Sequence, residues 1–351
     1  MFPITPTGNV KLHDVAAKAG VSVSTASRCL TGAVTMAKDT RARVLSAADS
    51  LGYRYNPLLG EVMRSTRRGS SNSYLGTLAY ITPFDDAQEW RSTLTLCGHW
   101  ASARERALSF GFGMAEFALT SERMTSRRLG EILKARGIMG VLLAAFPKDP
   151  FELILPWDHI ATVPVGHMIH QPKLDCVVSD HTEAVLMAGR TLAGRGYRRI
   201  GLALESYQNQ ITNRSWLTGY AALPLEYADL AQIPAYLPER MTPAGFMSWV
   251  RTNRVDCVLT VSTFRNVPND MQRWLAESGM LCPRDIGLAS LDVTSATAGW
   301  SGIDQSTDEI GKAAVDLVLS KVRAGDTGIP QVPRTLLVHS QWREGETVRL
   351  G

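Results

Sequence analysis

The sequence lacks any apolar run near the roughly 18 residues that a membrane-spanning helix needs. Its first residues, MFPITPTGNVKLHD, also lack the apolar centre of a secretory signal, so we expect a cytoplasmic protein with no membrane partner. Hydrophobic residues make up 45% of the 351 residues and charged residues 20%, the balance of a folded globular protein. The length predicts two or three domains with substantial cores.

Cysteine is scarce, and the five residues are odd in number, far apart and never in a C-x-x-C pair. This spacing argues against a disulfide framework or a zinc site, so we expect buried thiols. No P-loop, G-x-S-x-G or H-E-x-x-H motif is present, which argues against an enzyme, and we predict no cofactor. His167 and His170 are spaced to bind a metal, but without an acidic or thiol neighbour a surface pair is the favoured interpretation.

The positive charge is concentrated at one end of the chain. Residues 1–72 contain 10 Lys and Arg against 4 Asp and Glu, whereas the other 279 residues contain 27 against 29. A small basic segment on a nearly neutral body is typical of a module that binds a polyanion such as DNA.

The basic segment has the periodicity of three short helices. The first begins at Leu12 and ends at Gly20, and the second follows with Ser22 as its N-cap, so together they predict a helix-turn-helix. The stretch DTRARVLSAADSLGY predicts a third helix. The side chains that we expect to face inward in the second and third helices are Val23, Ala26, Cys29, Leu30, Val44, Leu45, Ala48 and Leu51.

The run KLHDVAAKAGVSVSTASRCLTGAVTMAKDTRARVLSAADSLGYRYNP resembles the N-terminal headpiece of the lactose-repressor (LacI/GalR) family. The motifs D-V-A-x-x-A-G-V-S-x-x-T-x-S-R and T-R-x-x-V-x-x-A-A-x-x-L-G-Y are both intact. A shared pattern of this length is highly specific. The resemblance implies an all-α DNA-binding headpiece whose second helix enters the major groove of double-stranded DNA.

In that docking mode, Ser24 and Arg28 would contact base edges, and so would Val23, although its place in the apolar stripe points it inward. Arg28 matches a base-reading position of the family, and its guanidinium can bond guanine O6 and N7 together. Val23 can contact only a thymine methyl. Five small hydroxyl side chains would bind phosphates: Ser22, Thr25, Ser27, Thr31 and Thr40. Capping or simple exposure is the alternative, above all for Thr31 and Thr40. Lys11 and Ala37 depart from the family's capping hydroxyls, which puts those two contacts in doubt.

The next segment, YRYNPLLGEVMRSTRRGSSNS, resembles the family's hinge helix, which forms when two chains lie side by side over the minor groove. Asn56 would cap this helix. The resemblance places Val62 where relatives insert a leucine between base steps and bend the duplex. An ordinary interdomain linker, with no insertion into DNA, is the alternative.

From Tyr74 onward, short apolar runs alternate with helical patterns, which predicts parallel sheets covered by helices on both faces. The stretches ARGIMGVLL, LAGRGYRRIGL and GIDQSTDEIGKAAVDL resemble the two-lobed, periplasmic-binding-protein-like (type I) α/β core of the same repressors. We expect the chain to cross between the lobes near Asp175, Gly302 to Gln305, and Arg334. The predicted parts are the headpiece 1–55, the hinge and linker 56–72, and the effector-binding and dimerisation core 73–351. Within the core, we expect one lobe at about 73–174 and 305–334 and the other at about 175–304 and 335–351.

Ligands of open α/β sheets bind beyond the carboxyl ends of the strands, which here would face a cleft between the lobes. Arg214 and Asp292 match effector-binding positions of the family and would pair a donor with an acceptor for sugar hydroxyls, whereas each alone could form a surface salt bridge. Gln305 would touch the ligand or only the hinge backbone. Aromatic candidates for stacking on a sugar, or alternatively for the core, are Phe84, Phe146 and Trp216.

Phe264 and Arg265 stand where relatives often have an Asn-Asp pair that binds sugar hydroxyls. This departure puts a simple pentose or hexose in doubt and leaves room for a larger, acidic or phosphorylated ligand. Phe264 remains a candidate lining residue of the effector site.

The resemblance therefore implies a DNA-binding transcriptional regulator, which in this family is usually a repressor. We expect it to bind a pseudo-palindromic operator as a homodimer and to respond to a small-molecule effector such as a sugar or sugar derivative. The tail REGETVRLG has no leucine heptad, so we expect a dimer rather than a tetramer. A solute-binding protein of the same core fold is the alternative, but it would need export and no basic headpiece.

Overall fold

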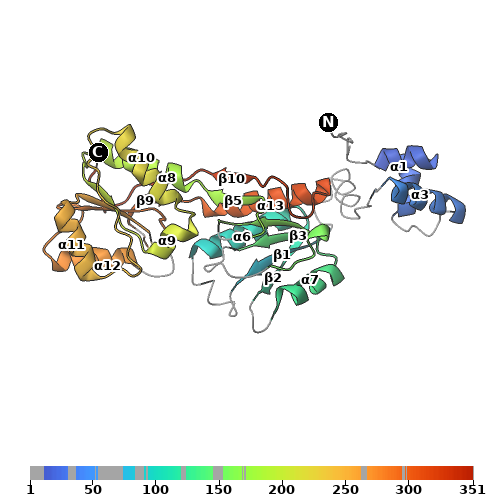
Figure 1. Cartoon of the computed structure of the whole chain (residues 1–351), viewed down its shortest axis with the longest axis horizontal. Coiled ribbons are helices and arrows are strands. Elements are labelled where there is room, and N and C mark those ends of the chain that lie inside the picture. The colour runs from blue at the N-terminus through green and yellow to red at the C-terminus, as the bar shows by residue number, and fades with distance from the viewer. Residues whose placement is uncertain are drawn as a thin grey trace, which may run out of the picture. The chain divides into compact units, whose positions relative to one another are not determined.

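The structure is a computed structural model of the chain, and contacts divide it into two units, Met1–Leu75 and Gly76–Gly351, each described here by itself (Figure 1). We refer to these units as the headpiece and the core. The residues described are 12–30, 37–51, 53, 74–83, 91, 94–119, 124–144, 153–167, 169, 171–261, 267–294, 297 and 299–350. The predicted hinge and linker, 56–72, lies outside them.

The headpiece contains three helices, α1 (Leu12–Ala19), α2 (Val23–Leu30) and α3 (Lys38–Ser50). Gly20 adopts a φ of 65°, a left-handed conformation that glycine takes at little cost, and it ends α1 as predicted. All three helices contribute to one small core, made of Val15, Ala16, Ala19, Ala26, Cys29, Val44, Ala47 and Ala48.

Two of the expected inward positions are wrong. Val23 is 48% exposed and Leu45 is 47% exposed, whereas Ala47 is buried. Successive helical residues are rotated by about 100°, so the face that buries Val44 and Ala48 turns Leu45 toward solvent. The same geometry sends Val23 outward when Ala26 and Cys29 face the core.

The first lobe of the core is built on a parallel four-stranded sheet in the order β2-β1-β3-β4. Its strands are β1 (Gly76–Thr82), β2 (Phe112–Ala118), β3 (Gly140–Leu143) and β4 (Ala161–Pro164). Helix α7 (Ser126–Ala135) covers one face, and α6 (Leu94–Ser109) with α13 (Thr307–Ala324) covers the other (Figure 1). A short 3-10 turn, η1 (Trp157–His159), precedes β4. Burial on both faces explains why β3 is apolar at every position.

The second lobe has a five-stranded sheet in the order β11-β9-β8-β7-β6, parallel except for the antiparallel edge strand β11. The strands are β6 (Ile200–Leu202), β7 (Cys257–Thr260), β8 (Gly287–Ser290), β9 (Ser301–Asp304) and β11 (Gln341–Arg343). The expectation of parallel sheets therefore holds for every strand of this sheet except β11.

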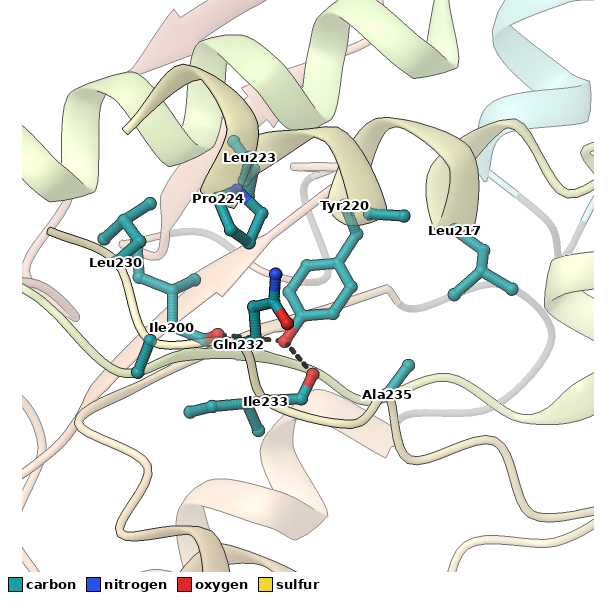
Figure 2. A pocket seen from close by; sticks show the side chains of 11 residues that line it. Ile200, Leu217, Tyr220, Leu223, Pro224, Leu230, Gln232, Ile233 and Ala235 are labelled. Carbon is teal, nitrogen blue, oxygen red and sulfur yellow. Dashed lines mark hydrogen bonds between the residues drawn. The ribbon is translucent and has the colours of Figure 1, made fainter. Parts of the chain in front are cut away.

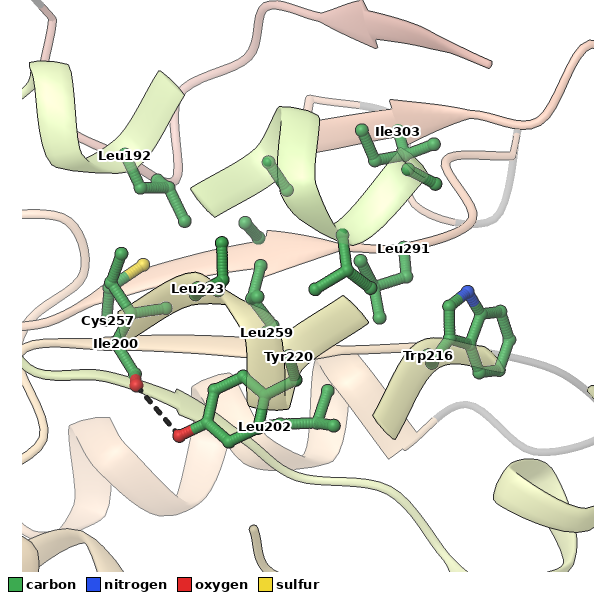
Figure 3. Close-up of a cluster of buried hydrophobic side chains, with 14 of the residues drawn as sticks. Leu192, Ile200, Leu202, Trp216, Tyr220, Leu223, Cys257, Leu259, Leu291 and Ile303 are labelled. Atoms are coloured by element: carbon green, nitrogen blue, oxygen red, sulfur yellow. Dashed lines mark hydrogen bonds between the residues drawn. The ribbon is translucent and has the colours of Figure 1, made fainter. Parts of the chain in front are cut away.

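Helices cover both faces of the second sheet. On one face α8 (His181–Gly194) and α10 (Ser215–Glu226) pack over the apolar cluster drawn in Figure 3, which includes Leu202, Leu259 and Leu291. On the other face α11 (Pro243–Asn253) and α12 (Val267–Glu277) pack over a second cluster around Phe246 and Trp274. A short helix, α9 (Ser206–Ile211), follows β6. The predicted two-lobed α/β architecture is confirmed.

The chain links the two lobes through paired strands, β5 (Cys176–Ser179) and β10 (Thr335–Val338), and through the connection from β9 to α13. Asp175, just before β5, is fully buried and accepts hydrogen bonds from Lys321 Nζ of α13 at 2.8 Å and from the backbone N–H of Arg334 at 2.8 Å. Burial alone would raise the pKa of Asp175, but its hydrogen bonds with Arg334 and Lys321 lower the pKa to about 2. This network joins two of the linking strands to a helix of the first lobe.

All five cysteines are free thiols, as predicted from their spacing. Cys29 and Cys257 are buried, but the other three are only half-buried, so the expectation of buried thiols is wrong for Cys97, Cys176 and Cys282. These three stand near the ends of elements or on their outer faces, where part of the side chain stays in contact with solvent.

Candidate functional site

Helix α2 is held in place by a cap at its N-terminus. The backbone N–H of Thr25 donates to Ser22 Oγ at 3.1 Å, and Ser22 Oγ also lies 2.8 Å from Thr25 Oγ1. The predicted role of Ser22 as N-cap is thus confirmed. A capped N-terminus leaves the first turn of α2 rigid, with positive dipole charge directed outward.

The opening turns of α2 present a continuous exposed face. Val23, Ser24 and Arg28 are exposed, Thr25 and Ser27 are half-buried, and Ala26 and Cys29 are buried against the other helices. Ser24 and Arg28 are separated by four residues and therefore lie on the same side of the helix. The candidate base-contacting residues share the face that an approaching groove would meet.

The headpiece also exposes positive charge on each of its three helices. Five basic residues of the described headpiece are exposed, and they come from all three helices: Lys18, Arg28, Lys38, Arg41 and Arg43. Ala37 is the N-cap of α3 and gives no side-chain hydrogen bond, as its departure from the family pattern predicts. Lys11, Thr31, Asn56 and Val62 lie outside the described residues.

In the core, Asp292 follows β8 directly and is 4% exposed. It accepts a 2.8 Å hydrogen bond from Thr95 Oγ1 in the first turn of α6, so it joins the two lobes. Burial raises the pKa of Asp292 to about 7, with a smaller rise from the nearby charge of Asp304, although the hydrogen bond from Thr95 opposes both. The carboxyl therefore sits close to the balance between its neutral and charged forms at neutral pH.

Arg214 is the second residue that the family resemblance assigns to the effector site. It adopts a left-handed φ of 61° as the N-cap residue of α10, and its side chain is exposed. In the part of the chain that the structure describes, its guanidinium makes no hydrogen bond or ion pair. The structure thus brings Asp292 together with Thr95 and leaves Arg214 unengaged.

The other effector candidates divide into two groups. Gln305 is buried, and its Nε2 donates to the backbone oxygen of Leu291 at 2.8 Å, which is the backbone contact that we considered as its alternative role. Trp216 is 2% exposed and stands at one end of the apolar cluster in Figure 3, with its indole N–H unpaired. Phe84, Phe146 and Phe264 lie outside the described residues.

Several buried polar side chains near the ends of strands have atoms without a hydrogen-bond partner. Thr82 ends β1, Thr260 ends β7, and His181 begins α8 directly after the β5 crossing. Each unpaired buried polar group costs about 1–3 kcal/mol, so such groups in one region indicate a place where water or a ligand supplies the missing partner. Other atoms of this kind are His99 Nδ1 and Nε2, Asn209 Oδ1 and Trp216 Nε1.

Sequence reasoning missed Thr95, His99 and His181 as site residues. His181 could have been found, because it directly follows a predicted strand and therefore stands where ligands of α/β sheets bind. Thr95 and His99 lie within a helix and belong to no motif, so only the fold shows that they approach the second lobe.

A separate pocket of about 340 Å³ opens on the second lobe (Figure 2). It lies between α10 and residues 230–235, and its walls are mostly apolar, with the Tyr220 hydroxyl donating to the backbone oxygens of Ile200 and Ile233. None of the predicted effector residues that the structure describes lines it. Its lining residues therefore give no support to the predicted effector set.

Metal binding and membrane insertion find no support among the described residues. No group of three or more His, Cys, Asp or Glu side chains there is placed to hold a metal ion. The ring centroid of His167 lies 6.4 Å from that of His181. His170 lies outside the described residues. Within the same ranges, no helix combines the length and apolar character that crossing a membrane requires.

Two family models match the chain. Residues 11–56 match "Bacterial regulatory proteins, lacI family", and residues 190–348 match "Periplasmic binding protein-like domain". Among curated relatives, an uncharacterized HTH-type transcriptional regulator of Streptomyces limosus is 32% identical over 202 residues, which is 55% of this chain and only 52% of that relative. The HTH-type transcriptional repressor PurR of Haemophilus influenzae (strain PittEE) is 23% identical, covering 92% of this chain and 94% of its own.

Solved structures share the fold. A complex of the transcriptional regulator CelR with cellobiose aligns with a TM-score of 0.61 and 22% identity, covering 96% of this chain and 99% of that one. The lac repressor dimer bound to operator and the anti-inducer ONPF aligns with a TM-score of 0.57 and 17% identity, covering 97% and 99%. The headpiece motif, the two-lobed core and these matches agree, and the expectation of a transcriptional regulator rather than an enzyme is confirmed. Residues 11–56 therefore belong to the lacI family of bacterial regulatory proteins, and residues 190–348 to the periplasmic binding protein-like domains.

Proposed function

We propose that this regulator binds a pseudo-palindromic operator as a homodimer, acts in the cytoplasm as a repressor, and changes its DNA affinity when a small molecule binds between the lobes. The observation that carries the proposal is the exposed N-terminal face of α2, where Val23, Ser24 and Arg28 stand on a capped helix among basic side chains. One headpiece is long enough for one half-site only, so a palindromic operator requires two chains.

Base recognition would depend on Arg28, whose planar guanidinium can form two hydrogen bonds with guanine. Val23 would contact a thymine methyl, and the hydroxyl side chains Ser22, Thr25, Ser27 and Thr31 would hold phosphates. In the hinge, Asn56 would cap a helix formed on DNA, and Val62 would wedge into the central base step.

The effector that fits the described residues best is a neutral, hydroxyl-rich molecule, such as a sugar. Asp292 is buried near Asp304, so an anionic ligand would meet carboxylate charge, whereas hydroxyls can donate to Asp292. Trp216 offers an unpaired N–H, and Arg214 an unengaged guanidinium. Gln305, Phe84, Phe146 and Phe264 complete the proposed lining. The cellobiose complex of a structural neighbour supports this class of ligand.

Regulation would follow from thermodynamic linkage between the DNA-binding site of the headpiece and the ligand site of the core. If the ligand and the operator favour different arrangements of the lobes, each lowers the affinity for the other by the same factor. Asp292 and Thr95 come from different lobes, so a ligand that engages both would favour one lobe arrangement over another.

The test is operator selection from random duplexes, followed by affinity measurements for wild type, Arg28→Ala and the matched charge-removal control Arg41→Ala. We expect Arg28→Ala to weaken operator binding at least tenfold while random-DNA binding changes little, because base contacts carry sequence information. Arg41→Ala should weaken both kinds of binding alike. Parallel losses for Arg28→Ala would show that Arg28 does not recognise bases.

A further inference from the structure

Three side chains with unpaired polar atoms come from helices of the two lobes. His99 lies in α6 of the first lobe, while His181 begins α8 and Trp216 lies in the first turn of α10, both in the second lobe. The rings of His181 and Trp216 are 5.0 Å apart and meet edge to face at 62°. A charge on His99 would lower the pKa of His181, which places the two imidazoles within electrostatic reach of each other.

His99 also stands one helical turn after Thr95, the residue that donates to Asp292. Residues four apart lie on the same face of a helix, so the face of α6 that contacts the second lobe presents His99 as well. His167 packs against His181 on the other side, with ring centroids 6.4 Å apart. The group is therefore continuous with the Thr95–Asp292 contact.

The polar atoms of this group are left without partners. Both ring nitrogens of His99, Nδ1 of His181 and Nε1 of Trp216 are buried and form no hydrogen bond among the described residues. His99 is only 8% exposed and Trp216 only 2%. An apolar side chain would fill the same volumes without leaving polar atoms unpaired, so packing alone does not account for these residues.

We propose that His99 and His181 are a pair of ligand-recognising residues, one from each lobe, and that a hydroxylated ligand bridges them when it binds. This inference rests on the proposed function, because it assigns the residues that recognise the effector.

The state of the imidazoles indicates the chemical class of that ligand. Burial lowers the pKa of His99 to about 4, and burial together with the neighbouring His167 and His99 lowers the pKa of His181 to about 3. Both rings are neutral at physiological pH, and each offers one N–H donor and one acceptor nitrogen. A hydroxyl group both donates and accepts, so it satisfies a neutral imidazole, whereas a carboxylate or phosphate can only accept. The pair favours neutral hydroxyl groups over anions.

The test uses the full-length protein titrated with D-glucose and cellobiose, and with gluconate and glucose 6-phosphate as charged counterparts, by calorimetry. His99→Phe and His181→Phe keep an aromatic ring but remove both nitrogens. His99→Gln and His181→Gln restore hydrogen-bonding atoms, and His159→Gln changes an exposed histidine as a control. The melting temperature of each ligand-free variant is measured in parallel.

We expect wild type to bind a neutral sugar and each Phe variant to bind it at least tenfold more weakly, with partial recovery in the Gln variants and no change in His159→Gln. The ligand-free Phe variants should melt no lower than wild type, because they remove unpaired buried nitrogens. Unchanged sugar affinity, a lowered melting temperature in the ligand-free Phe variants, or preference for the charged sugars would overturn the assignment. Failure of every sugar to bind wild type would instead contradict the proposed effector itself, and the assignment with it.

Discussion

Two buried aspartates contact the first lobe from different places, and they differ in how far their charge is compensated. The carboxylate of Asp175 accepts hydrogen bonds from Lys321 and Arg334, and its pKa is lowered to about 2. Asp292 has one hydroxyl donor, Thr95, and its pKa is raised to about 7. A carboxylate with all its partners inside the protein is a structural element, whereas one that lacks them is available to a ligand.

The surroundings of the two aspartates agree with this distinction. The Asp175 network joins the strands β5 and β10 to α13 through side chains that are already paired. By contrast, both ring nitrogens of His99, one turn after Thr95, and Nδ1 of His181 lack partners among the described residues. The polar atoms around Asp175 are therefore paired within the protein, whereas those of His99 and His181 are the ones that we propose a ligand engages.

The largest effect is expected when the paired network is broken. Lys321→Met should lower the free energy of unfolding by about 3 kcal/mol, because it removes one partner of a buried ion pair and leaves Asp175 undercompensated. Chemical denaturation measures this loss. The double variant Asp175→Asn with Lys321→Met should recover part of it, and a single variant as stable as wild type would contradict the structural role.

Asp292→Asn should change the free energy of unfolding in the opposite direction at neutral and alkaline pH. The pKa of Asp292 is raised above its unfolded value, so its favourable contribution is full below about pH 4 and is lost as the pH rises to about 7. Above pH 7 the ligand-free variant should be more stable than wild type by a few kcal/mol at most, on the order of 1.4 kcal/mol per pKa unit. Unfolding measured at pH 5 and pH 8 tests this, and an equal difference at both pH values would argue against the raised pKa.

Asp175→Asn provides the matched comparison. The pKa of Asp175 is lowered, so its contribution is present above about pH 4 and disappears as the pH falls toward 2. We expect a loss of about 2 kcal/mol at pH 7 that shrinks under acid conditions. A stability gain at pH 7, like that expected for Asp292→Asn, would abolish the distinction between the two aspartates.

The smallest effect is expected at the surface of α13. Lys312 pairs with Glu309 at 2.8 Å, but this pair is in solvent, which screens it. Lys312→Ala should leave the denaturation midpoint within experimental error. A loss comparable to that of Lys321→Met would show that burial is not what separates the two lysines.

The sequence predicted the headpiece well because its signals are local. A contiguous motif fixes the helix-turn-helix and the cap at Ser22, and only Val23 and Leu45 were assigned to the wrong face. A difference of one position along a helix changes the direction of a side chain by about 100°, which a short apolar pattern does not resolve.

The interlobe site was harder to predict because its contacts are distant in sequence. Thr95 and Asp292 are 197 residues apart, and nothing near Thr95 indicates its partner. Asp292 and Arg214 were assigned to the effector site by the family resemblance, and that assignment stays a prediction. His99 has no sequence signal, because a histidine within a helix has the same neighbours whether or not it is buried.

The most direct test of the account measures the affinity of the full-length protein for its selected operator and for a random duplex, with and without the neutral sugar that binds it best. We predict that the operator binds at least 10³-fold more tightly than the random duplex and that the sugar changes operator affinity several-fold while random-DNA affinity stays the same. Equal affinity for both duplexes, or operator affinity that does not respond to a bound sugar, would contradict a ligand-controlled, sequence-specific regulator.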